Sequence, residues 1–296
     1  MAEETFTVPG RGDVSLFVRH WPAPRPSRAV VQIAHGMAEH SARYARLAAA
    51  LGAAGYDVYA HDHRGHGRSV RSASELGHFG PDGWNALVDD LVAVGEAIDA
   101  RRGGSPRVLL GHSMGSFALQ QYLVDHSAEI AAAVLSGTSA VDVLFGGAGP
   151  ADAPLASIGE SQAFEGRTDF DWLSRDPGEV DRYVADPACG FEPDAEAVAD
   201  MAAAAVARPA GPDALTAVRS DLPILLMSGS DDPLSGNMAL VELVAQRYRD
   251  AGVRDVTVLG YEGARHELFN ETNRDEVTAD LVSWLDEHVE EGVDAR

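Results

Sequence analysis

A serine between two glycines is the first candidate for chemistry in this chain. Residues 111–115 read Gly-His-Ser-Met-Gly, directly after an apolar run at 107–110 and before a helix-like stretch that begins near Ser116. On a sharp turn between a strand and a helix, a serine hydroxyl stands clear of the backbone, and glycine neighbours make such a turn possible. The pattern indicates that Ser113 is a nucleophile. Because Gly-x-Ser-x-Gly also occurs as an ordinary turn of small residues, the interpretation requires partner residues.

Partners for this serine follow two later predicted strands. Asp231 and Asp232 come after the apolar run 223–229, and His266 comes after the next predicted strand. In open α/β sheets, ligands bind beyond the carboxyl ends of the strands, so we expect these side chains to gather near Ser113. His266 would take the serine proton, and Asp232 would hold the imidazole in the required tautomer. Asp231 is the alternative acid. We prefer Asp232 because a Gly-x-x-Asp loop leaves its side chain room to point inward.

Acyl-transfer chemistry also needs hydrogen-bond donors for a developing oxyanion. The backbone N–H groups of Met37, after the predicted strand 29–34, and of Met114, after the nucleophile, are in suitable positions. His112 also flanks Ser113. We expect its side chain to point away from the active face and to have a structural role.

The elements that would position these residues alternate along the chain. Apolar or alternating runs predict strands at 6–8, 14–18, 29–34, 57–60, 107–110, 131–137, 223–229 and 256–259. Helical spacing of apolar residues predicts helices at 41–54, 84–100, 116–125, 195–207, 237–251 and 276–288. Such alternation predicts an α/β fold with a mostly parallel central sheet that has helices on both faces.

The alternation breaks between residues 138 and 217. This stretch contains a Gly-rich segment, two Asp-Pro pairs and one clear helical run. A loop of this length is improbable inside a compact sheet domain. The sequence therefore predicts a core domain formed by residues 1–137 and 218–296, with residues 138–217 inserted as a helical lid.

Composition excludes several classes of function. The 296 residues include 46 acidic and 23 basic residues, which gives a formal charge of −23. Such a surface repels phosphate backbones and anionic lipids, so we expect neither nucleic-acid binding nor a stable membrane anchor. All basic residues are Arg, which excludes a lysine Schiff base. The N-terminus has no apolar signal region, so we expect a cytoplasmic protein. The sequence predicts no oligomeric state.

No cofactor or metal is expected. The single cysteine, Cys189, cannot form an internal disulfide or a cysteine-based zinc site. The spacing of His61, His63 and His66 is similar to a zinc pattern of metallo-β-lactamases, but that pattern has Asp before the last histidine, where this chain has Gly65. The glycines instead indicate a tight loop after a strand.

Five segments together resemble the serine-hydrolase branch of the α/β-hydrolase superfamily that contains monoacylglycerol lipases and lysophospholipase-like proteins. They are residues 35–44, 62–69, 111–115, 229–233 and 261–267. The order Ser, Asp, His along the chain is the order of that superfamily. The resemblance covers nearly the whole chain and is weakest at 138–217. It implies the α/β-hydrolase fold.

The resemblance also implies finer roles. In monoacylglycerol lipases, the residues that match Glu39 and Arg43 help to form a polar pocket for the alcohol part of the substrate; an ordinary ion pair at a helix start is the alternative. The family often has glycine where this chain has Ala38, and alanine would stiffen the oxyanion loop. Animal monoacylglycerol lipases have a second polar histidine where this chain has Phe269. This difference favours a less polar leaving group.

These observations predict a serine carboxylic-ester hydrolase that acts on a small acyl ester, such as a monoacylglycerol or lysophospholipid, through an acyl-Ser113 intermediate. A thioesterase, amidase or acyltransferase would use the same residues. A protein of this fold that binds a ligand without turnover is the alternative from another class, and the complete set of candidate residues argues against it.

Overall fold

The predicted strands form one sheet in the computed structural model, which describes residues 3–24, 27–101, 103–146, 166–207 and 212–289. Within these residues the sheet has eight strands in the order β1-β2-β4-β3-β5-β6-β7-β8. The strands are β1 (Glu4–Pro9), β2 (Ser15–Trp21), β3 (Ala29–Ala34), β4 (Tyr56–His61), β5 (Arg107–His112), β6 (Ala132–Ser136), β7 (Ile224–Gly229) and β8 (Val256–Tyr261). The pairs β1–β2 and β2–β4 are antiparallel and the others are parallel. The prediction of a mostly parallel sheet is confirmed.

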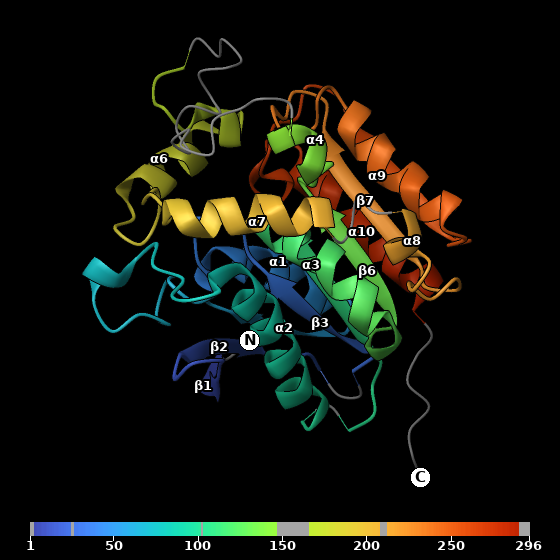
Figure 1. The fold of residues 1–296 in the computed structure, drawn as a ribbon, viewed down its shortest axis with the longest axis horizontal. Coiled ribbons are helices and arrows are strands. Elements are labelled where there is room, and N and C mark those ends of the chain that lie inside the picture. Colours follow the sequence, from blue (N-terminus) through green and yellow to red (C-terminus); the bar gives the residue numbers. More distant parts are fainter. Residues whose placement is uncertain (1–2, 25–26, 102, 147–165, 208–211, 290–296) are drawn as a thin grey trace.

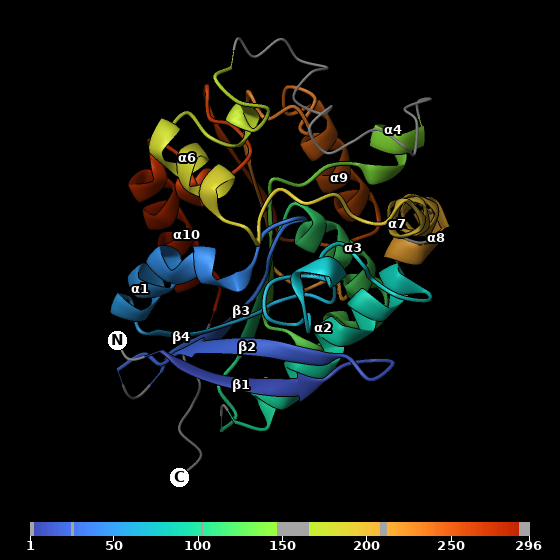
Figure 2. The same cartoon turned by 90° about the vertical axis from the view of Figure 1, so that its left-hand side faces the viewer.

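Helices cover both faces of this sheet (Figure 2). Helices α1 (Ala45–Ala53) and α10 (Arg274–His288) pack on one face, and α2 (Gly83–Asp99), α3 (Met114–His126) and α9 (Ala239–Asp250) pack on the other. The central strand β5 supplies apolar side chains to both layers, because successive residues of a strand point to opposite faces. Leu109 packs with α2 and α3, whereas Val108 and Leu110 pack with α1 and α10.

The segment between β6 and β7 contains more helix than the sequence analysis predicts. Its described helices are α4 (Val141–Gly146), α6 (Pro177–Ala185), α7 (Ala195–Ala207) and α8 (Pro212–Leu215). Helix α6 was not expected. Its start is nevertheless encoded locally, because the Asp176 carboxylate accepts a hydrogen bond from the Gly178 amide at 2.9 Å and Pro177 occupies the first turn.

Helices α4, α6 and α7 lie on the side of the sheet where the parallel strands end (Figure 1), and α7 contacts α2 and α4. Residues 147–165 and 208–211 of the predicted lid lie outside the described residues. Among the described helices, none is both long and apolar enough to cross a membrane.

Candidate active site

Ser113 occupies the turn between β5 and α3 in a conformation that few non-glycine residues adopt. Its φ is 51° and its ψ is −121°. The flanking glycines are required by close packing. A Cβ on Gly111 would lie 2.4 Å from the Gly115 carbonyl oxygen, and a Cβ on Gly115 would lie 2.1 Å from that of Ala34. The Ser113 amide donates to the Ser136 carbonyl at 2.9 Å, which ties the turn to the end of β6. Strain of this kind persists where the surrounding structure enforces it, often at functional sites.

His266 and Asp232 meet beyond the ends of β7 and β8. His266 Nδ1 lies 2.8 Å from Asp232 Oδ2, and both side chains are buried. The other carboxylate oxygen accepts a hydrogen bond from the Leu234 amide at 2.9 Å. Asp231 is exposed, and its carboxylate accepts a hydrogen bond from Ser230. Of the two candidate acids, the structure brings Asp232 to the histidine.

The surroundings of His266 favour its charged form relative to a free imidazole. Burial opposes protonation, but the charge and hydrogen bond of Asp232 outweigh it, so the pKa of His266 is raised above its ordinary value. Because Nδ1–H donates to the carboxylate, Nε2 is left with a lone pair that can accept a proton. The Trp172 ring packs against the imidazole with a centroid separation of 4.9 Å.

His112 does not point away from the site, so that expectation is wrong. Its ring centroid lies 4.8 Å from that of His266, and its side chain lines a cavity together with Glu39. Burial, followed by the charge of His266, lowers the pKa of His112 to about 4. His112 is the last residue of β5 and lies two residues after Leu110, so the alternation of side chains along the strand places it on the α1 face, where the cavity lies.

The two backbone donors named in the sequence analysis lie at the ends of β3 and β5. Met114 is the first residue of α3, so its amide has no acceptor one turn earlier in the helix. Met37 lies in the loop after β3. A Cβ on the preceding Gly36 would lie 3.2 Å from Ser113 Cβ, which shows how closely this loop approaches the serine. Within the described part of the chain, neither Met amide donates to another backbone group.

Glu39, Arg43 and Phe269 line one cavity, so the structure brings together all three residues of the suggested substrate pocket. Its lining comprises Glu39, Arg43, Tyr44, Arg46, Leu47, His112, Glu267, Phe269 and Asn270. Arg43 Nη1 donates to Glu39 Oε2 at 2.8 Å, so the ion pair considered as an alternative is also present. Phe269 is largely buried in the core between the sheet and α1.

Glu267 is a member of this cavity that the sequence analysis did not single out. Its carboxylate accepts two hydrogen bonds from the Arg43 guanidinium, at 2.5 and 2.7 Å. Burial disfavours the charge on Arg43, but Glu267 and Glu39 outweigh it and raise the pKa of Arg43 well above its ordinary value. Burial likewise disfavours the charge on Glu39, but Arg43 outweighs it and lowers the pKa of Glu39. The only sequence signal for Glu267 is its position beside His266.

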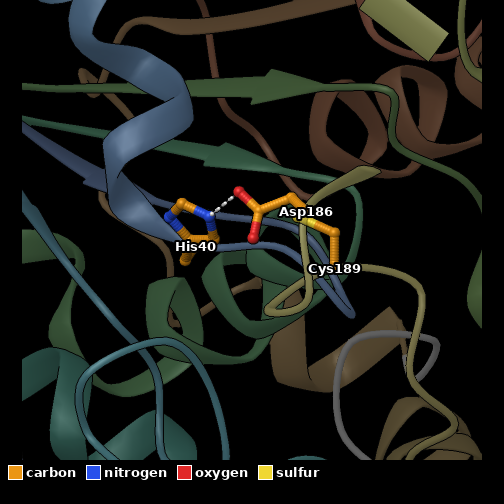
Figure 3. A group of neighbouring side chains, drawn as sticks. All are labelled: His40, Asp186 and Cys189. Carbon is orange, nitrogen blue, oxygen red and sulfur yellow. Dashed lines mark hydrogen bonds and ion pairs between the residues drawn. The ribbon is translucent and has the colours of Figure 1, made fainter. Parts of the chain in front are cut away.

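Two groups of potential metal ligands have other hydrogen-bond partners. His40, Asp186 and Cys189 place ligand atoms within 4.8 Å of one another (Figure 3). His40 Nε2 is paired with Asp186 Oδ2 at 3.0 Å, and burial raises the pKa of the Cys189 thiol, which disfavours the thiolate that binds metals.

The histidines of the 61–66 motif bond within the protein. His61 Nε2 lies 3.1 Å from His63 Nδ1, and His66 Nδ1 lies 2.8 Å from the Arg64 carbonyl oxygen. They form the tight loop that the glycines predict.

Comparisons with known proteins show the family of this chain. The family described as "Serine aminopeptidase, S33" (Hydrolase_4) matches residues 25–273. A monoacylglycerol lipase of Mycolicibacterium smegmatis is 35% identical over 95% of this chain and 96% of its own length. A monoglyceride lipase of Homo sapiens is 29% identical, over 86% of this chain and 81% of its own. The structure of a carboxyl esterase from Bacillus coagulans matches with a TM-score of 0.84 at 25% identity, over 98% of this chain and 99% of that one. The chain belongs to the serine aminopeptidase S33 (Hydrolase_4) family of α/β-hydrolases and is a monoacylglycerol lipase-like serine hydrolase of the carboxylesterase and lipase class.

Proposed function

We propose that this enzyme hydrolyses small carboxylic esters, such as monoacylglycerols, through an acyl-Ser113 intermediate. The observation that carries the proposal is the buried His266–Asp232 pair, 2.8 Å apart, in the loops after β7 and β8 of the sheet that also presents Ser113 at a strained turn. The similarity to a monoacylglycerol lipase and to a carboxyl esterase supports ester hydrolysis. Residues 138–217 would form the lid over the acyl chain.

In the first half of the reaction, Ser113 Oγ attacks the ester carbonyl carbon while His266 Nε2 takes the hydroxyl proton. The carbonyl oxygen becomes an oxyanion, which the Met37 and Met114 amides would stabilise. Asp232 keeps the imidazole oriented and stabilises the imidazolium. When the tetrahedral intermediate collapses, the bond to the alcohol oxygen breaks, and His266 returns its proton to that oxygen.

In the second half, water replaces the alcohol. His266 takes a proton from water, the resulting hydroxide attacks the acyl carbon, and a second tetrahedral intermediate forms at the same donors. Its collapse breaks the bond to Ser113 Oγ, which regains a proton from His266. The acid is released and the enzyme returns to its starting state.

The leaving alcohol would lie in the cavity that Glu39, Arg43 and Phe269 line. Because Arg43 is paired with two carboxylates, no unpaired cation of this side chain is available to an anionic leaving group. Phe269 supplies an apolar wall. We therefore propose a neutral alcohol of modest polarity rather than a phosphorylated one.

The test is hydrolysis of p-nitrophenyl esters from acetate to palmitate and of a monoacylglycerol, by wild type and by Ser113→Ala. We expect turnover by the wild type and a loss of at least about 10³-fold in kcat in the variant. The chain-length optimum would measure the acyl site.

Activity that survives Ser113→Ala, or no turnover of any ester, would contradict the proposal. Parallel assays with an acyl thioester, an acyl amide and a competing alcohol acceptor would then separate the thioesterase, amidase and acyltransferase alternatives. Thermal stabilisation by an ester that is not consumed would favour a binding protein.

A further inference from the structure

The loop after β3 contains a strained residue next to the proposed oxyanion donor. Ala38 is fully buried and has a φ of 53°. The left-handed region is unfavourable for an L-residue, because Cβ approaches the following carbonyl oxygen. The conformation therefore has to be held by contacts from outside the loop.

Those contacts come from a segment far away in the sequence. The Ala38 carbonyl oxygen accepts a hydrogen bond from Tyr183 Oη at 2.9 Å and another from the Gly190 amide at 3.0 Å. The Gly190 amide is also within 3.2 Å of Tyr183 Oη, so the three groups form a closed set. We call residues 183–190, which include the end of α6 and the turn after it, the clamp segment.

The clamp segment is itself fixed. Tyr183 is 3% exposed, and its ring packs against Phe170 with a centroid separation of 5.0 Å. The Arg43 guanidinium lies 4.9 Å from the same ring. Asp186 bonds to His40, the residue at the far end of the oxyanion loop, at 3.0 Å (Figure 3). The segment thus holds the loop at two points.

The remaining polar groups of the loop are held by the core. The Ala38 amide donates to His66 Nε2 at 3.2 Å, and the Gly36 amide donates to Glu39 Oε1 at 2.6 Å. The Gly36 carbonyl lies 2.7 Å from His35 Nδ1. In a trans peptide the C=O and N–H groups point in opposite directions, so this last bond also fixes the direction of the Met37 N–H.

We infer that the clamp segment, chiefly Tyr183, is a positioning element for the oxyanion hole. It holds the Ala38 carbonyl group, and with it the loop, so that the Met37 amide faces the reacting carbonyl. The inference rests on the proposed function. An oxyanion donor lowers the barrier only where it meets the oxyanion at hydrogen-bond distance, so a small displacement of the loop reduces kcat. Substrate binding, which uses the cavity of Glu39 and Arg43, is less affected.

The test is Tyr183→Phe, which removes one hydroxyl and keeps the ring. We expect kcat for a p-nitrophenyl ester to fall about 10-fold, with a KM within about 2-fold of wild type. The midpoint pH of the acid limb of the rate profile should be unchanged. Tyr248→Phe is the matched control, because Tyr248 is a buried tyrosine of α9 whose hydroxyl has no hydrogen-bond partner among the described residues. It should retain the wild-type kcat.

A second variant keeps the inference testable if Tyr183→Phe is unstable. Asp186→Asn weakens the attachment to His40 without touching the Ala38 carbonyl, and we expect a smaller fall in kcat, about 3-fold, again without a rise in KM. Wild-type kcat in a folded Tyr183→Phe protein would overturn the inference, as would a rise in KM at constant kcat. Failure of the proposed function would give a different result, because Ser113→Ala would then leave the activity intact.

Discussion

Acid should destabilise this protein through a group of buried histidines under the oxyanion loop. His35, His61, His63 and His66 are fully buried and bond to one another or to nearby backbone as neutral rings. Burial lowers the pKa of His61 and of His66 to about 4, from an ordinary value of 6.5; the charge of Asp62 opposes this shift at both rings. A neutral ring can accept a hydrogen bond from the N–H group that faces it, whereas an imidazolium cannot.

The sign and size of the effect follow from linkage. Since each folded pKa lies below the unfolded value, the unfolded chain binds the proton first, and stability is lost as the pH falls from 6.5 towards 4. One pKa unit corresponds to 1.36 kcal/mol. Each ring therefore lowers the free energy of unfolding by up to about 3 kcal/mol at pH 4, and by about 2 kcal/mol at pH 5. Above pH 6.5 both rings are neutral in the folded and the unfolded chain, so neither ring lowers the free energy of unfolding.

The assay is urea unfolding, followed by tryptophan fluorescence, at pH 7.5 and pH 5, for wild type and His61→Gln. The variant lacks one titrating ring, so its free energy of unfolding should fall by about 2 kcal/mol less than that of wild type between the two pH values. His78→Gln is the matched surface control, because the His78 side chain is 63% exposed. An equal fall in wild type and His61→Gln would refute the reasoning.

Three further predictions concern the proposed catalytic residues and the glycine that packs against one of them. Asp232→Asn should lower kcat by about 10⁴-fold, because the imidazole loses its tautomer and its counter-charge, whereas Asp231→Asn should stay within about 2-fold of wild type; steady-state kinetics on one ester compares them. Since the reaction needs neutral His266 and its pKa is raised, activity should be full above that pKa and lost below it, with an acid limb above pH 6.5 in a pH–kcat/KM profile. Gly137→Ala should lower both the melting temperature and kcat, because Gly137 has a φ of 56° and its Cβ would lie 3.1 Å from His266 Cε1; unchanged kcat would show that the ring can move aside.

The elements and the proposed Ser-His-Asp set were predictable because they rest on local patterns. Apolar runs encode the strands, and Ser113, Asp232 and His266 each lie in the turn or loop after such a run. The loop pattern also predicted Asp232 rather than Asp231, and the structure places Asp232 beside the histidine.

Other features depend on contacts that no local pattern records. Tyr183 meets the Ala38 carbonyl across 145 positions of sequence, and Glu267 meets Arg43 across 224. Helix α6 was missed although its capping aspartate and proline are visible, because Asp-Pro pairs also mark loops.

The end of β6 contacts both the proposed nucleophile and the proposed base. The Ser136 carbonyl bonds to the Ser113 amide, the Gly137 amide bonds to the Met227 carbonyl of β7, and Gly137 lies against the His266 ring. The predicted lid, residues 138–217, begins only after this point. We therefore expect that the predicted lid can be exchanged between relatives without moving the proposed nucleophile or base. A graft that omits the contact with the Ala38 carbonyl would keep the triad and yet lose rate, so chimaeras between relatives should carry that contact across with the insertion.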